Sequence, residues 1–203
     1  MNQIKQFFWK LLSTDKFNDF SSLAVKTPGP ISKKAAEDAC AKEVLSVRED
    51  GANAGTFVER YLSAVGLDAG NPWCMAIVVL RLIKAAHSLA LTSPSQMPRT
   101  GSTVVFSNWG KSKSWFIKRA DLELGRAKIQ EGDIVFYFFA AKGRIAHTGI
   151  VVDATSNNDF KTVEGNTSSG IKDVVDRDGQ GVYMKQRSIS SLGLFGGVVR
   201  LPY

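Results

Sequence analysis

The first half of the chain carries hydrophobic residues at helical spacing. This pattern predicts a helix over residues 32–47, with Ser32 as its N-cap, and a second helix over residues 56–65. Residues 75–90 are apolar on nearly every side, which is typical of a buried central helix. Residues 92–130 follow neither a helical nor a strand period. We therefore predict two peripheral helices, one central helix and an irregular segment.

From residue 132 onward the pattern changes to the alternation of β-strands. Five strands are predicted, over residues 132–139, 146–153, 160–166, 181–185 and 197–201. The turn-forming segments AAKGR and TSNN separate the first three strands. Helices followed by an antiparallel meander predict an α+β domain in which the N-terminal helices pack on an antiparallel β-sheet.

The segment KTPGP at residues 26–30 is turn-forming and marks the best candidate for a domain boundary. We expect residues 1–31 to form a basic, amphipathic N-terminal arm and residues 32–203 to form the main domain. The chain starts MNQIKQFFWKLL, in which Lys10 divides the apolar part, and no small-residue cleavage site follows. This start is not typical of a secretory signal, and no stretch is apolar enough for a transmembrane helix.

Charge narrows the classes of partner. The 203 residues include 26 Lys and Arg against 19 Asp and Glu, a net charge of +7. Residues 1–34 hold six basic and two acidic side chains, and residues 99–128 hold seven and two. A basic protein is attracted to nucleic acid, to membrane surfaces or to anionic wall polymers. Because the excess lies in two segments without a nucleic-acid motif, we expect no nucleic acid as partner and favour a wall or membrane.

Cysteines and histidines are few, which excludes a disulfide scaffold and a Cys/His zinc site, and we expect no metal or cofactor. Cys74 follows Pro72 at the start of the central helix, where the helix dipole favours the thiolate. His147 lies on a predicted strand. In contrast, Cys40 is expected to be an apolar packing residue in mid-helix, and His87 a structural residue.

The register of the predicted hairpin brings polar residues beside the histidine. Asn166 is placed opposite His147, and Glu164 lies one pair along on the same face. Asp153 is about 20 Å along the strand from His147, too far to orient its ring. The preceding hairpin places Tyr137 across from His147. Either Glu164 or Asn166 is therefore the expected orienting group.

A thiolate, a histidine and a polar third residue form the papain-type arrangement of a cysteine hydrolase. Cys74 would attack a carbonyl carbon, and His147 would protonate the leaving amine. The main-chain N–H of Cys74 is a natural donor to the oxyanion. Spacing alone does not establish this arrangement, because the two residues are far apart in the sequence.

Six segments then occur in a defined order: GNPWC, GDIVFY, AHTGIVVD, VEGNTS, GVYMKQRS and GGVVRLP. Together they resemble the CHAP family of cysteine, histidine-dependent amidohydrolases and peptidases, over about residues 33–203. The resemblance implies a papain-like fold with Cys74 as nucleophile and His147 as general base. It further implies that Glu164 orients the histidine and that Asn166 supports the same site. Residues 75–77 and the long basic segment 100–128 depart from the family's usual pattern.

The implied activity is cleavage of amide bonds in peptidoglycan. An N-acetylmuramoyl-L-alanine amidase and a stem or cross-bridge endopeptidase both fit. For substrate binding we expect four aromatic residues: Trp73, Tyr137, Trp109 and Trp115. The last two lie among lysines and suit stacking on sugars, although packing within the domain is the alternative.

The sequence also leads to expectations about where the protein acts and how it gets there. We expect synthesis in the cytoplasm without a secretory signal, followed by action in the periplasm or at the wall. Phage lysis and contact-dependent injection, for instance by a type VI secretion system, are two such routes, and an injected effector would have an immunity protein as partner. Three other functions remain open: a basic nucleic-acid-binding module, an amidase of the same fold acting on a non-wall peptide conjugate, and an inactive wall-binding protein.

Overall fold

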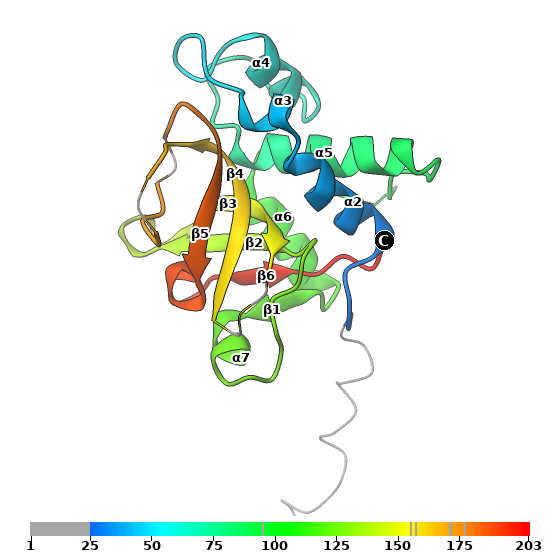
Figure 1. Cartoon of the computed structure of the whole chain (residues 1–203), viewed down its shortest axis with the longest axis vertical. Coiled ribbons are helices and arrows are strands. Elements are labelled where there is room, and N and C mark those ends of the chain that lie inside the picture. The colour runs from blue at the N-terminus through cyan, green and yellow to red at the C-terminus, as the bar shows by residue number, and fades with distance from the viewer. Residues whose placement is uncertain (1–24, 95, 155, 157, 171, 177) are drawn as a thin grey trace, which may run out of the picture.

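The computed structural model describes residues 25–203 apart from residues 95, 155, 157, 171 and 177. Of the predicted amphipathic arm at residues 1–31, residues 1–24 lie outside the described residues, and its last two residues are the start of a helix. The described chain is an α+β domain built on one antiparallel sheet, as the hydrophobic pattern predicts (Figure 1). In the described part of the chain, no helix is long and apolar enough to cross a membrane.

The helices gather mainly in the N-terminal half. They are α2 (Pro30–Ala39), α3 (Lys42–Leu45), α4 (Thr56–Ser63), α5 (Cys74–Ser88), α6 (Thr103–Ser112) and α7 (Arg119–Glu123). Helices α2 and α5 lie side by side along the sheet, and α3 and α4 lie beyond them (Figure 1). The central position of α5 agrees with its nearly continuous apolar surface.

The start of the first helix differs from the prediction. Helix α2 begins at Pro30, with Gly29 rather than Ser32 as its N-cap, because proline is favoured in the first helical turn. Ser32 is buried inside the helix, and its hydroxyl donates a 3.3 Å hydrogen bond to the carbonyl of Tyr203. The main-chain N–H of Gly29 donates to the carbonyl of Leu201 at 2.8 Å. The first described residues are thus fastened to the C-terminal end of the chain.

Cys40 was expected in the core, and this prediction is wrong. The predicted single helix over residues 32–47 is interrupted after Ala39, and Cys40 is the C-cap residue of α2. At this position its thiol is exposed. The helical periodicity continued across the break, and this is why the sequence pattern placed Cys40 on a buried face.

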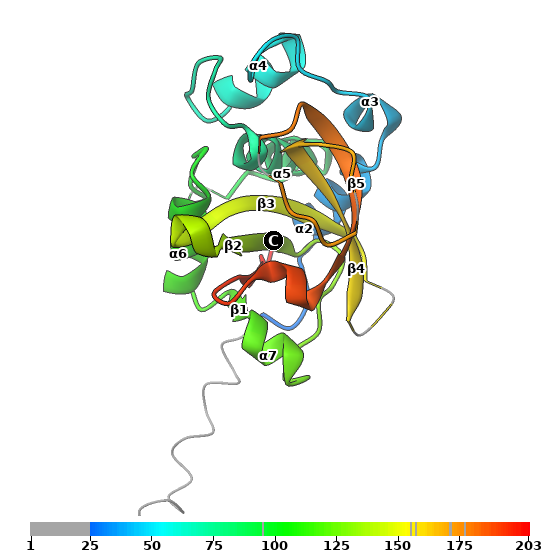
Figure 2. The ribbon, with the colours of Figure 1, turned by 90° about the vertical axis from the view of Figure 1, so that its left-hand side faces the viewer.

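The sheet has the strand order β1-β6-β2-β3-β4-β5. Figure 2 shows β2 and β3 side by side in its middle, with β4 and β5 to one side. Its strands are β1 (Phe116–Lys118), β2 (Ile134–Phe139), β3 (Arg144–Asp153), β4 (Asp159–Thr167), β5 (Gly181–Ser188) and β6 (Gly197–Val199). Strands β2 to β5 form the predicted meander. The prediction that residues 92–130 are irregular is wrong, because they contain α6, β1 and α7. Strand β1 pairs with β6 at the far end of the sequence, so its partner was not visible in a local pattern.

Both faces of the sheet are covered. On one face, Phe136 and Ile150 pack in a large core with α2, α4, α5 and α6. On the other face, Val135 and Val151 pack with α7 and with the 3₁₀ helix Ile189–Leu192. Helices therefore lie mainly, but not wholly, on one side, and the central strands β2 and β3 are buried over most of their length.

Candidate active site

Cys74 is the first residue of the central helix α5. Its side chain is only 4% exposed, and Trp73 is the N-cap. In the described structure no side-chain hydrogen bond caps this helix. The first main-chain N–H groups of a helix lack intrahelical acceptors and carry its positive partial charge. The N-terminus of α5 therefore offers both a thiol and uncapped donors at one point.

The chain just before Cys74 is held by Asn166. Its side-chain oxygen accepts a 3.3 Å hydrogen bond from the main-chain N–H of Trp73. Its amide nitrogen donates to Asn53 Oδ1 at 2.9 Å and to the carbonyl of Gly179 at 3.1 Å. Asn166 itself has a left-handed backbone, with a φ of 57°, where the β4–β5 register shifts. Asn166 thus supports the cysteine rather than the histidine.

His147 lies on β3 and Glu164 on β4, and both are completely buried. The Nε2 atom of His147 lies 2.9 Å from Glu164 Oε2. Gly149 makes this pairing possible, because a Cβ atom there would come 2.6 Å from Cγ of Glu164. Of the two predicted orienting groups, the structure brings Glu164 to the imidazole. The predicted pairing of Tyr137 with His147 is also confirmed.

Glu164 is the centre of a buried hydrogen-bond cluster. Its Oε1 accepts from the hydroxyl of Tyr137 at 2.7 Å and from that of Thr162 at 2.6 Å. Arg187 on β5 binds both carboxylate oxygens, Nε to Oε1 at 2.9 Å and Nη2 to Oε2 at 2.6 Å. A buried carboxylate needs such partners to remain charged. The cluster therefore holds a fixed negative charge behind the His147 ring.

These contacts change the acid–base properties of both residues. Burial raises the pKa of Glu164, but the bonds from Arg187 and His147 outweigh it and hold the pKa far below its usual range. Burial lowers the pKa of His147, but the Cys74 side chain and Glu164 outweigh it and raise the pKa to about 9. At neutral pH the favoured ring is an imidazolium, which both neighbours stabilise.

The ring nitrogen that remains for chemistry is Nδ1. Nε2 hydrogen-bonds to Glu164. Nδ1 is buried and makes no hydrogen bond to any described residue. The Cys74 thiol nevertheless lies close enough to be the largest of the influences that raise the pKa of His147. The imidazolium therefore has two neighbours that favour its charge, the Cys74 side chain and Glu164. This arrangement suits nucleophilic attack followed by proton delivery.

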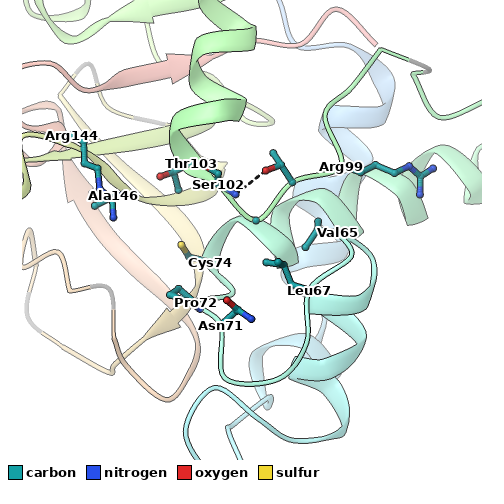
Figure 3. Close-up of a pocket in the computed structure, with 12 residues that line it drawn as sticks. Val65, Leu67, Asn71, Pro72, Cys74, Arg99, Ser102, Thr103, Arg144 and Ala146 are labelled. Atoms are coloured by element: carbon teal, nitrogen blue, oxygen red, sulfur yellow. Dashed lines mark hydrogen bonds between the residues drawn. The ribbon is translucent and has the colours of Figure 1, made fainter.

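A cleft of about 370 Å³ opens beside Cys74 (Figure 3). The sulfur faces the space between the first turn of α6 and the start of β3. Its walls come from the loop before α5, the segment before α6 and strand β3; the lining residues are Val65, Leu67, Asn71, Pro72, Cys74, Arg99, Thr100, Gly101, Ser102, Thr103, Arg144 and Ala146. A carbonyl compound in this cleft would meet the sulfur directly.

The four aromatic residues expected to bind substrate do not line this cleft. Trp73 is fully buried, stacks on Tyr61 and donates to Glu49 at 2.7 Å. Tyr137 is buried with its hydroxyl on Glu164. Trp109 and Trp115 pack against the large core and against each other, with ring centroids 5.3 Å apart. The prediction for Trp109 and Trp115 failed because the lysines beside them in the sequence do not determine the direction in which the indole rings point.

Arg187 was missed by the sequence reasoning. Its strand alternates between buried and exposed positions, with Lys185 and Arg187 buried and Met184 and Gln186 exposed. Arg187 pairs with Phe160, four residue pairs from Tyr183, the partner of Glu164, and therefore on the same face of the strand. The sequence did contain a signal for this contact: β5 has two basic residues at inward positions, and a buried basic side chain needs a carboxylate partner.

A comparison with protein families finds a match to the CHAP domain over residues 66–166. The matched range contains Cys74, His147, Glu164 and Asn166, while Arg187 lies beyond it. No curated protein and no solved structure matches the chain. No group of three or more His, Cys, Asp or Glu side chains in the described ranges is placed to hold a metal ion.

Proposed function

Because the chain belongs to the CHAP family, we propose that it is a cysteine hydrolase that cleaves an amide bond of bacterial peptidoglycan. One observation carries this proposal: a helix-start cysteine faces an open cleft while a buried carboxylate orients and charges the neighbouring histidine. As part of the proposal, we assign the papain-like form of the α+β fold, since cysteine and histidine come from a helix and a strand.

The residues have distinct roles in the proposed reaction. The Cys74 thiolate attacks the carbonyl carbon, and the oxyanion accepts from main-chain N–H groups at the start of α5. His147 donates its Nδ1 proton to the departing amine, leaving a thioester. The neutral ring then takes a proton from water, which hydrolyses the thioester and frees Cys74. Glu164 keeps Nε2 protonated throughout, and Asn166 holds the backbone before Cys74.

Two bonds in the wall suit this chemistry. One is the N-acetylmuramoyl-L-alanine amide, and the other is a peptide bond of the stem or cross-bridge. Mass spectrometry of fragments released from purified peptidoglycan distinguishes them. New stem-peptide N-termini at alanine identify an amidase, whereas separated cross-links identify an endopeptidase.

The same experiment tests the proposal as a whole. Wild-type protein should release fragments, and Cys74→Ala and His147→Ala should release none while keeping their folded circular dichroism spectra. Cys40→Ala is the matched control, because this second thiol is exposed and lies outside the cleft. Equal activity in Cys74→Ala and wild type would refute the proposed nucleophile. Absence of fragments from every wall type would refute the substrate.

We further propose that the enzyme reaches the wall by phage-type lysis or by injection into a competing cell, where an immunity protein would neutralise it. The predicted basic N-terminal arm, residues 1–31, would then act as an electrostatic guide through the part that precedes α2, and residues 32–203, together with the first turn of α2, would be the catalytic domain. Co-expression tests the second route: a gene beside this one should encode a periplasmic protein that suppresses lysis. Suppression by no neighbouring gene would leave the lysis route favoured.

A further inference from the structure

The cleft beside Cys74 is positively charged on two sides. Arg99 and Arg144 both line it, and among the described residues of its lining none is acidic. Figure 3 shows Arg144 on the wall nearest Ala146, with its guanidinium on the cleft side, whereas Arg99 lies at the opposite rim with its side chain extending away from Cys74. Two cations without a carboxylate between them attract an anionic group.

A second hollow next to the cleft is also lined by cations. It holds about 180 Å³ and shares Arg144 with the cleft, so the two lie next to one another. Lys111 lines it as a further cation, and no acidic residue is among its described lining. Exposed Phe195 and half-buried Phe138 form an aromatic wall, with ring centroids 4.9 Å apart. Arg144 therefore lies at the junction of a polar cleft and a hollow with an apolar side.

Arg144 also has unused hydrogen-bonding capacity. Its Nη1 donates a 3.2 Å hydrogen bond to the carbonyl of Ile145, and the described residues offer no other acceptor to the guanidinium. A guanidinium presents several N–H donors in a planar fork that matches a carboxylate. The bond to Ile145 restrains the side chain and leaves its remaining N–H donors without a partner among the described residues.

We propose that the substrate carries a free carboxylate next to the scissile amide and that Arg144 recognises it as the specificity-determining residue. This inference rests on the proposed function and narrows it to acidic peptides. Stem peptides with an unamidated carboxyl group beside the cleaved bond are substrates, and the same peptides with a carboxamide are poor ones.

The test uses two synthetic muramyl stem peptides that differ only in a carboxylate or a carboxamide beside the scissile amide. Wild type should cleave the carboxylate form with a kcat/KM about fivefold higher, the size expected of one solvent-exposed ion pair. Arg144→Gln should remove that preference. Lys142→Gln should retain it, because Lys142 is an exposed cation of the same hairpin that lines neither hollow.

A second measurement does not depend on turnover. Iodoacetate and iodoacetamide alkylate the same thiol, but only the first is an anion. The ratio of their rates at Cys74 should fall about fivefold in Arg144→Gln and should stay unchanged in Lys142→Gln. Added salt should reduce the wild-type ratio.

The outcomes separate the two proposals. Equal cleavage of both peptides by wild type, or an unchanged alkylation ratio in Arg144→Gln, overturns the role of Arg144 and leaves wall hydrolysis standing. If neither peptide nor wall is cleaved, the proposed function fails. An alkylation ratio that still depends on Arg144 would then keep the cleft as an anion-selective site on a different substrate.

Discussion

Two buried arginine–carboxylate pairs stabilise this domain, and only one of them touches a histidine. Arg187 binds Glu164 through bonds of 2.9 and 2.6 Å, and Arg200 binds Asp133 through bonds of 2.8 and 2.7 Å. All four side chains are almost completely buried. The pairs therefore have nearly the same chemistry and geometry.

Their surroundings differ. Arg200 also donates to the carbonyls of Lys26 and Lys128, so its pair ties the start of the described chain to the sheet. Burial dominates at Asp133 and raises its pKa, whereas the additional donors around Glu164 hold its pKa low. The Glu164 pair therefore holds a negative charge at the imidazole, whereas the Asp133 pair only joins the first described residues to the sheet.

The largest expected difference is in catalysis. Glu164→Gln should lower kcat/KM for wall hydrolysis about 10³-fold, because the neutral amide no longer stabilises the imidazolium or fixes its tautomer. Asp133→Asn should leave kcat/KM per folded molecule within about threefold of wild type. Initial rates on labelled peptidoglycan, corrected for the folded fraction, give both values. Similar losses in the two variants would break the distinction between the pairs.

Loss of either arginine should lower the free energy of unfolding by a similar amount. Arg187→Met and Arg200→Met each leave a buried carboxylate without its main partner and should lower the free energy of unfolding by about 3 kcal/mol. Urea titrations followed by tryptophan fluorescence measure this loss. Only Arg187→Met should also shift the pH profile of activity. A shifted profile in Arg200→Met would contradict the purely structural role of that pair.

In acid the two pairs should act in opposite directions. The lowered pKa of Glu164 gives stability that is present above its ordinary value of 4.5 and is lost as the pH falls. The raised pKa of Asp133 means that its contribution decreases as the pH rises through 3.8. Glu164→Gln should therefore flatten the loss of stability between about pH 5 and pH 3, and Asp133→Asn should steepen it. Unfolding free energies at several pH values test both signs.

The smallest predicted effect is that of Tyr137, whose hydroxyl lies at the edge of the hydrogen-bond cluster around Glu164. Tyr137→Phe removes one hydroxyl donor from Glu164 and leaves three other residues bound to it. We expect a loss of about 1 kcal/mol in stability and a few-fold decrease in kcat. Phe136→Leu, a change in the same strand on the opposite face, controls for packing alone. A loss as large as that of Glu164→Gln would show that Tyr137 is not peripheral.

Local sequence patterns predict much of this site. The alternation in β3 and β4 predicts a register with Asn166 opposite His147. The pairing of Ile150 with Val163 has this same register, and Glu164 reaches His147. Cys74 was visible because proline and an apolar run mark the start of α5.

Long-range contacts were not foretold. Arg187 reaches Glu164 from a third strand, whose register depends on a long loop rather than a tight turn. The positions of Trp109 and Trp115 depend on α6 and β1, and β1 exists only because it pairs with β6. Cys40 is exposed because α2 stops one residue before it, and helix ends are the least certain feature of a periodic pattern.

The most direct test of the central claim is the pKa of His147, measured by NMR titration of its ring carbon-bound protons in wild type and in Glu164→Gln. The account predicts a value of about 9 in wild type and a clear decrease in the variant, because the buried carboxylate is one of the groups that raise it. A wild-type value near 6.5 that does not change in Glu164→Gln would contradict the claim that this pair charges the catalytic imidazole.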